Sequence, residues 1–268
     1  MATRLHQILE RTRQHVAECK QRMPLRILEA SAEQHLPRGF AQALRNRAHE
    51  GPAVIAELKK ASPSKGLIRE QFDAAVLAPQ MEVGGAAALS VLTDEPFFQG
   101  SLANLEAASS ATSLPCLRKD FIVDTYQIVE ARAHRADAIL LIAAALTDAE
   151  LRAFTDGAHA LSLDVLCEVH TRDEVDRVAD LGCAMVGVNN RDLRTFEVRL
   201  DTSVELAPHL PRAALHVAES GIRTPEDYAR LHSAGFQAFL IGESFMRQPD
   251  PGAALAVWLR DCAALASA

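Results

Sequence analysis

The chain has 268 residues, of which 49% are hydrophobic and 24% are charged, as in an ordinary soluble protein with room for one large α/β domain. Its formal net charge of -7 provides no basic surface field, so neither a nucleic acid nor a membrane is an expected partner. The longest apolar run, residues 138–146, is too short to cross a bilayer, and the N-terminus lacks a signal-peptide core.

Residues 1–50 precede the first predicted strand. Apolar residues recur at helical spacing in two stretches, from Leu5 to Val16 and from Phe40 to Leu44. We therefore expect two added helices that pack on the main fold. No flexible linker follows them, so residues 1–268 are predicted to form a single domain.

From residue 53 onward, short apolar runs alternate with longer amphipathic segments. The pattern predicts eight strands, at residues 53–59, 87–92, 115–118, 137–142, 163–169, 184–189, 214–219 and 237–241. Helix starts are expected at Asp124, Thr147, Thr171 and Thr224. Eight βα units over residues 53–268 predict an α/β fold, the (β/α)8 TIM barrel. An open doubly wound sheet is the alternative, but no G-x-G-x-x-G follows the first strand.

The first predicted strand ends in charged residues, within the segment VIAELKKASPSKG at residues 54–66. Residues two apart in a strand share a face, so Glu57 and Lys59 should point the same way. Burial of both charges is costly unless they pair or bind a ligand, and a surface ion pair is the alternative. The loop at residues 60–69 has little apolar sequence, which predicts a mobile lid.

Polar residues recur at the carboxyl ends of later strands, where a TIM barrel holds its active site. They are Lys119, Glu168, Asn189, Arg191, Glu219 and Ser220. Any one of them could be a solvated charge at a strand end, but their repeated placement predicts a shared site. Such a site could supply both acids and bases, and a lysine beside a second cation would have a lowered pKa.

Glycines follow the last two strands. Gly221 comes after Ser220, and Gly242 with Glu243 begins GESFM, which predicts a short helix. Backbone N–H groups exposed by glycine at a helix start form the phosphate site of many such barrels. We therefore expect a small anionic substrate.

Several other chemistries lack their motifs. The histidines and cysteines show no metal-ligand spacing, and neither a serine-nucleophile elbow nor a Walker loop is present, so no metal or cofactor is predicted. His170, beside Glu168, is expected to have a supporting rather than a direct role. The five cysteines include no C-x-x-C pair, which predicts reduced core residues of a cytoplasmic protein.

Six segments together resemble indole-3-glycerol phosphate synthases: VIAELKKASPSKG, LTDEPFFQGS, LRKDFIVDTYQIVEAR, VGVNNRDLRTFEV, VAESGI and FLIGESFM. The resemblance runs from about residue 5 to the C-terminus and includes loops as well as strands. Small departures occur at Cys116, Arg135 and Glu243, where the family has an apolar residue, a glycine and, in some members, a serine. The departure at Glu243 matters little if the backbone N–H of this residue binds phosphate.

This resemblance implies conversion of 1-(2-carboxyphenylamino)-1-deoxyribulose 5-phosphate to indole-3-glycerol phosphate, carbon dioxide and water, in tryptophan biosynthesis. It implies that Lys119 is the general acid of ring closure and that Glu168 and Lys59 are the base and acid of dehydration. Orienting roles would fall to Glu57, Asn189 and Glu219. Substrate binding would fall to Ser62, Arg191, Ser220, Gly221, Gly242 and Glu243. A monomer without a fused partner enzyme is also implied.

Two other functions remain open. A Schiff-base aldolase would also use lysines at strand ends. A silent phosphate-ligand binding protein is the second alternative, but it would not need acids and bases on five strands.

Overall fold

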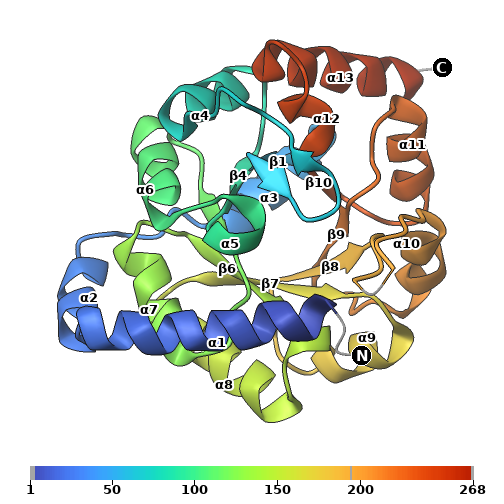
Figure 1. The fold of residues 1–268 in the computed structure, drawn as a ribbon. Coiled ribbons are helices and arrows are strands. Elements are labelled where there is room, and N and C mark those ends of the chain that lie inside the picture. The colour runs from blue at the N-terminus through green and yellow to red at the C-terminus, as the bar shows by residue number, and fades with distance from the viewer. Residues whose placement is uncertain (1–3, 194, 267–268) are drawn as a thin grey trace.

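The computed structural model describes residues 4–193 and 195–266, in which eight parallel strands close into a barrel in the order β1, β10, β9, β8, β7, β6, β5, β4 (Figure 1). These strands are β1 (Ala53–Leu58), β4 (Ala88–Leu92), β5 (Cys116–Lys119), β6 (Ala138–Ile142), β7 (Asp164–Val169), β8 (Met185–Asn189), β9 (Leu215–Glu219) and β10 (Ala238–Ile241). Their bounds differ from the predicted ones by no more than one residue. The predicted TIM barrel is confirmed.

Helices surround the barrel as an outer ring (Figure 1). They are α4 (Ala74–Val83), α6 (Leu102–Ala111), α7 (Thr125–Ala133), α8 (Asp148–Ala160), α9 (Arg172–Val178), α10 (Asp201–Leu206), α11 (Pro225–Ser233) and α13 (Pro251–Ala266). The predicted caps Asp124, Thr147, Thr171 and Thr224 each accept a hydrogen bond from a backbone N–H in the first turn. These caps fix where each loop at the carboxyl end of the barrel stops and its helix begins.

Shorter elements lie in the loops. They are the hairpin strands β2 (Ala61–Ser62) and β3 (Gly66–Leu67), the short helices α5 (Glu95–Phe98) and α12 (Glu243–Met246), and the 3₁₀ turns η1 (Ala143–Ala145) and η2 (Ala207–His209). Helix α12 is the one predicted from GESFM. The hairpin lies within residues 60–69, which were predicted to be a loop.

Alternation along the strands separates the barrel interior from the layer under the helices. Ile55, Leu117, Leu166 and Val217 belong to one apolar cluster, which also contains Phe40 from the N-terminal segment. Residues of the opposite parity belong to a second cluster with the surrounding helices. Two residues further along, the same four interior rows reach charged side chains, namely Glu57, Lys119, Glu168 and Glu219. The period of two thus brings these charges to one end of the barrel.

Between residues 4 and 52, three helices precede the barrel, not the two predicted: α1 (Arg4–Arg22), α2 (Leu25–Ala32) and α3 (Phe40–Ala48). Helix α2 buries only Leu28 and Ala32, so its sequence lacks a strong apolar repeat. Helix α3 lies at the amino-terminal end of the barrel, where the backbone N–H of Ala41 donates to Asp164 at 2.8 Å. Helix α1 runs beside α7, and its first turns reach the opposite, carboxyl end of the barrel.

A buried ion pair joins this N-terminal segment to the barrel. Asp137, which has no exposed surface, accepts hydrogen bonds from Arg38 Nη2 at 2.6 Å and from the backbone N–H of Cys116 at 2.6 Å. His35 Nε2 lies 3.1 Å from the same carboxylate. Burial opposes ionisation, but these donors hold the pKa of Asp137 below its usual range. The contacts support our proposal that residues 1–268 form a single domain, although residues 1–3 and 267–268 lie outside the described part.

The prediction that all cysteines are reduced is wrong for two of them. Cys167 on β7 and Cys183 before β8 form a disulfide, with their Cα atoms 6.6 Å apart. Both belong to the cluster under the helices, and their spacing of sixteen residues gave no sign of this proximity. Among the described residues, no helix has both the length and the apolar character that a membrane crossing requires.

Candidate active site

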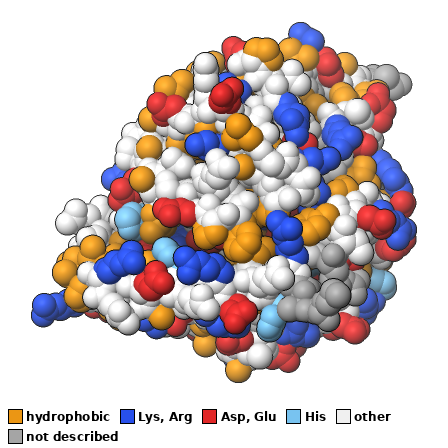
Figure 2. Space-filling view, viewed as in Figure 1, with side chains coloured by type: hydrophobic (Ala, Val, Ile, Leu, Met, Phe, Trp, Pro, Cys, Tyr) orange, Lys and Arg blue, Asp and Glu red, His pale blue; other side chains and the backbone are white. Residues whose placement is uncertain are grey.

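A cavity of about 1020 Å³ opens at the carboxyl ends of the strands, on the side of hairpin β2–β3. Figure 2 shows hydrophobic side chains beside Lys and Arg side chains near the middle of this face. Every predicted site residue lines the cavity, namely Glu57, Lys59, Ser62, Lys119, Glu168, Asn189, Arg191, Glu219, Ser220, Gly221, Gly242 and Glu243. The fold therefore brings together residues that are up to 186 positions apart in the chain (57 to 243).

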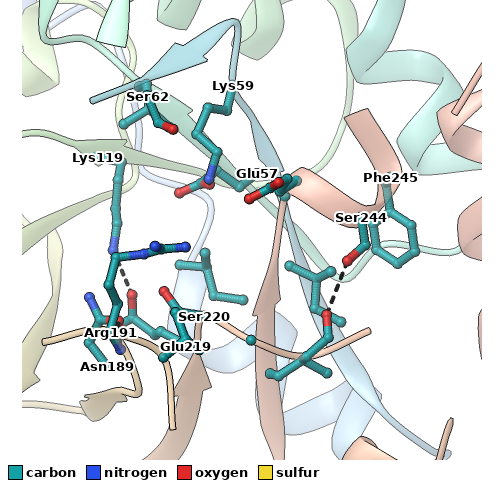
Figure 3. A pocket seen from close by; sticks show the side chains of 18 of the residues that line it. Glu57, Lys59, Ser62, Lys119, Asn189, Arg191, Glu219, Ser220, Ser244 and Phe245 are labelled. Carbon is teal, nitrogen blue, oxygen red and sulfur yellow. Dashed lines mark hydrogen bonds and ion pairs between the residues drawn. The ribbon is translucent and has the colours of Figure 1, made fainter. Parts of the chain in front are cut away.

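Lys119 lies between two buried carboxylates. Its Nζ is 3.0 Å from Glu168 Oε2. It is also 2.5 Å from Glu219 Oε2 (Figure 3). Burial disfavours the ammonium form, but the charges of Glu168 and Glu219 outweigh it and raise the pKa of Lys119 well above its usual range. The condition for a lowered lysine pKa, a second cation nearby, is not met at Lys119, because its immediate neighbours are anions.

The pKa values of the two carboxylates beside Lys119 are shifted in opposite directions. Burial favours the neutral form of Glu168, but Lys119 and His170 outweigh it and hold its pKa below the usual range. For Glu219, burial and the nearby charges of Glu168 and Glu57 raise the pKa in spite of Lys119. Glu168 is thus the one that stays ionised, and Glu219 is the more easily protonated.

Glu57 and Lys59 leave β1 on the same side, as predicted, and Lys59 Nζ donates a hydrogen bond to Glu57 Oε2. Gly242 lies against this pair. A Cβ added at Gly242 would come within 2.5 Å of Glu57 Oε2 and 2.9 Å of Glu57 Cβ. A glycine at 242 therefore gives the Glu57 side chain its space, in addition to exposing the backbone.

The loops after β8 and β1 meet at Arg191. The backbone N–H of Arg191 donates to Asn189 Oδ1 at 3.0 Å, and its Nη1 lies 3.5 Å from Ser64 Oγ. Ser62, Lys59 and Arg191 all face the cavity in Figure 3. Arg191 is thus within reach of the predicted lid.

The segment at residues 60–69 is anchored mainly at its end. Ile68 is buried, and Arg69 Nη1 donates to the carbonyl oxygens of Met246 at 3.1 Å and Gln248 at 2.9 Å. The tip of the hairpin, residues 63–66, is exposed or half-buried. Mobility remains a prediction, and we expect it only at the tip of the hairpin, residues 63–66.

We expect amide hydrogen exchange at residues 62–66 to be fast in the free protein and slower when an analogue of the expected product is bound. Residues 68 and 69 should be protected in both states and serve as the internal control. Equal exchange at the tip with and without product would contradict a lid.

Backbone geometry is unusual after β9. Ser220 and Gly221 have φ angles of 65° and 82°, in the left-handed region that favours glycine. Ser244 Oγ donates to the carbonyl of Ile222 at 3.2 Å, which ties this loop to the start of α12. The Glu243 side chain turns toward Arg247, whose Nε lies 3.0 Å from Glu243 Oε1. The part of Glu243 that faces the cavity is therefore mainly its backbone.

The apolar wall of the cavity was not predicted residue by residue. It includes Leu92, Phe98, Phe121, Leu140 and Ile142, with Leu5 and Ile8 from α1. The aromatic residues directly after strand ends, in EPFF and KDF, were the available signal. The wall can accommodate an aromatic ring beside the charged groups.

Within residues 4–193 and 195–266, no group of three or more His, Cys, Asp or Glu side chains is arranged to hold a metal ion.

Comparison with known proteins gives a consistent result. The family model described as indole-3-glycerol phosphate synthase matches residues 5–257. The chain is 58% identical over 255 residues to the indole-3-glycerol phosphate synthase of Koribacter versatilis, with 95% of this chain and 98% of that protein covered. It is 52% identical to that of Azoarcus sp. over 259 residues, with 95% and 98% covered.

Solved structures share the fold at low identity. A tryptophan synthase alpha-subunit from Pyrococcus furiosus aligns with a TM-score of 0.59 and 13% identity, covering 79% of this chain and 98% of that one. A 3-hexulose-6-phosphate synthase aligns with a TM-score of 0.61 and 16% identity, covering 78% and 99%.

Proposed function

The chain belongs to the indole-3-glycerol phosphate synthase family, and we propose how its cavity carries out the reaction of that family. The enzyme is a decarboxylating lyase of tryptophan biosynthesis. Its substrate is 1-(2-carboxyphenylamino)-1-deoxyribulose 5-phosphate, and its products are indole-3-glycerol phosphate, carbon dioxide and water. The observation that carries our assignment of roles is the position of Lys119 in the cavity, charged and buried between two carboxylates.

In the first step, the ring carbon that bears the carboxylate attacks the ketone carbon, and the anilino nitrogen supplies the electron push. Negative charge develops on the ketone oxygen, and Lys119 donates a proton to it. An alkoxide is much more basic than an amine, so the raised pKa of Lys119 does not prevent this transfer. The same ammonium charge stabilises the developing oxyanion.

Loss of carbon dioxide then restores the aromatic ring. The remaining step removes the hydroxyl group as water, together with a proton from the neighbouring methylene carbon. We assign the base to Glu168, because its lowered pKa keeps it ionised. We assign the acid to Lys59, whose hydrogen bond to Glu57 fixes its position at the end of β1. Asn189 and Glu219 orient the substrate and Lys119.

We assign substrate binding to residues around the rim. The phosphate is held by Ser62 and the backbone N–H groups at Ser220, Gly221, Gly242 and Glu243, and the carboxylate lies near Arg191. Phe98 and Phe121, with ring centroids 6.4 Å apart, form part of the wall for the anilino ring. Formation of indole fluorescence from the named substrate tests the function directly.

A Schiff-base aldolase is disfavoured by the state of Lys119. Attack on a carbonyl requires a neutral amine, but two carboxylates hold this lysine as an ammonium ion. Borohydride should therefore not trap the substrate on the protein. Turnover of the named substrate would exclude a silent binding protein.

Removal of metal ions is expected to leave kcat unchanged, because the proposed acids and bases are protein side chains. The measurement is turnover after prolonged dialysis against EDTA. Loss of activity that a divalent ion restores would contradict the mechanism.

Substitution at the phosphate loop should separate backbone from side-chain roles. We expect Gly242→Ala to raise KM and also to lower kcat, because the added Cβ must displace Glu57. The matched control, Glu243→Ala, should change KM by less than about threefold, because it keeps the backbone N–H and removes a side chain directed at Arg247. Inorganic phosphate should compete with substrate. A strong rise of KM in Glu243→Ala would show that its side chain contacts substrate.

We propose that the enzyme acts as a cytoplasmic monomer with no nucleic-acid or membrane partner. The net charge of -7 supports the absence of a nucleic-acid or anionic-membrane partner. Light scattering in solution tests the oligomeric state.

A further inference from the structure

His170 directly follows β7 and contacts two carboxylates. Its Nε2 lies 3.4 Å from Glu168 Oε1, and its Nδ1 lies 3.2 Å from Glu174 Oε2. Nε2 is not aligned with the Glu168 oxygen as in a regular hydrogen bond, so that contact is mainly electrostatic. The His170 side chain is 11% exposed and does not line the cavity. His170 and Lys119 contact different oxygens of the Glu168 carboxylate, Oε1 and Oε2.

The start of α9 holds the second carboxylate in place. Thr171 is the N-cap of this helix and accepts a hydrogen bond from the backbone N–H of Glu174. The Glu174 carboxylate in turn accepts a hydrogen bond of 2.7 Å from the backbone N–H of His170. A carboxylate in the first turn is also favoured by the helix dipole. The sequence EVHTRDE therefore builds a fixed anchor for the imidazole.

We propose that His170 is a positioning residue for the reaction: anchored by Glu174, its imidazolium holds Oε1 of Glu168 and so directs Oε2 toward Lys119 and the substrate. The inference rests on the proposed role of Glu168 as base. It deepens that role by naming the group that fixes the orientation of the base and keeps it ionised.

The charges around Lys119 explain why a further cation beside Glu168 is useful. Glu57, Glu168 and Glu219 are buried with only two lysines, and Lys119 is shared between Glu168 and Glu219. The charged groups that act on His170 are Glu168 from β7 and Glu174 from α9. Burial disfavours the charged imidazole, but these two carboxylates raise the pKa of His170 to about 10. His170 is therefore a cation throughout the neutral pH range.

Two substitutions at His170 test the proposal by kcat, KM and their pH dependence. We expect His170→Leu to lower kcat roughly 10- to 100-fold, as loss of an orienting partner does at other sites, with KM changed by less than about threefold. Loss of the cation raises the pKa of Glu168, so the acid limb of the kcat profile should move to higher pH. His170→Gln keeps a donor and should recover part of the loss in kcat, but not the position of the limb.

Glu174→Gln tests the anchor while leaving the imidazole in place. Without the Glu174 charge, the pKa of His170 falls, so kcat should decline at a lower pH on the alkaline side than in the parent enzyme. His134→Leu is the matched control, because it removes an ion pair of similar chemistry, His134 Nδ1 to Glu106 Oε1 at 3.1 Å, and neither residue lines the cavity. Its kcat should equal that of the parent enzyme.

Parent-like kcat and pH profiles in His170→Leu and Glu174→Gln would overturn the inference. So would a loss in His170→Leu that accompanies a lower melting temperature, with no movement of either limb, because that result indicates a structural role. Glu168→Gln distinguishes failure of this inference from failure of the proposed role of Glu168 as the base. If Glu168→Gln is impaired and His170→Leu is not, only this inference fails; if Glu168→Gln is fully active, the proposed base is wrong.

Discussion

Lys119→Met is expected to lower kcat by about 10²–10⁴-fold, the typical contribution of a positioned general acid. We assign this proton to Lys119 rather than to Lys59, because Lys59 is held beside Glu57 at the end of β1, where we place the later dehydration. KM should change little, because Ser62, Arg191 and the glycine loops still hold the phosphate and carboxylate. Methionine keeps the length of the side chain and removes only its charge and protons.

Single-turnover measurements of carbon dioxide release test this prediction, because decarboxylation can only follow ring closure. Lys20→Met is a matched control, since Lys20 forms a partly exposed ion pair with Asp124 away from the cavity. Lys59→Met should differ from both by changing KM as well as kcat, because Lys59 lies beside the loop that contains Ser62. A Lys119→Met enzyme that decarboxylates at the parent rate would show that another residue is the acid.

The sequence predicted the barrel and the membership of the site for a physical reason. A strand repeats every two residues, so an interior apolar row such as Ile55 continues directly into a charged residue such as Glu57. The same continuation links Leu117 to Lys119 and Val217 to Glu219. Four such rows, on β1, β5, β7 and β9, end at one rim, so the sequence alone could identify these residues as candidates for one site.

The sequence did not show which of these residues contact each other, because these contacts depend on which strands face each other across the barrel. The sequence did not show which charges lie beside Lys119, because closure of the barrel places Glu219, a hundred residues away, against it. The disulfide between Cys167 and Cys183 was missed for another reason, because a spacing of sixteen residues does not show that two cysteines, one on β7 and one just before the neighbouring β8, lie close together. The interaction of His170 with Glu174 is local, at a spacing of four residues, and could have been found from the cap at Thr171.

Glu168→Gln is expected to lower kcat by about 10²–10³-fold while carbon dioxide is still released in the first turnover. Glutamine retains the size of the side chain but cannot take the methylene proton, so dehydration stalls after ring closure. Lys119 keeps its ion pair with Glu219 in this variant, and it remains able to protonate the ketone oxygen. The ring-closed, decarboxylated intermediate should therefore accumulate.

Rapid quenching compares the carbon dioxide and the indole product formed in one turnover of the Glu168→Gln enzyme. We expect near-stoichiometric carbon dioxide with a slow rise of indole fluorescence, whereas the two should appear together in the control Glu205→Gln, which alters an exposed pair with Arg199. If both products fall in parallel in Glu168→Gln, Glu168 acts at or before ring closure. Its contact with Lys119 would then serve to orient the acid rather than to supply the base.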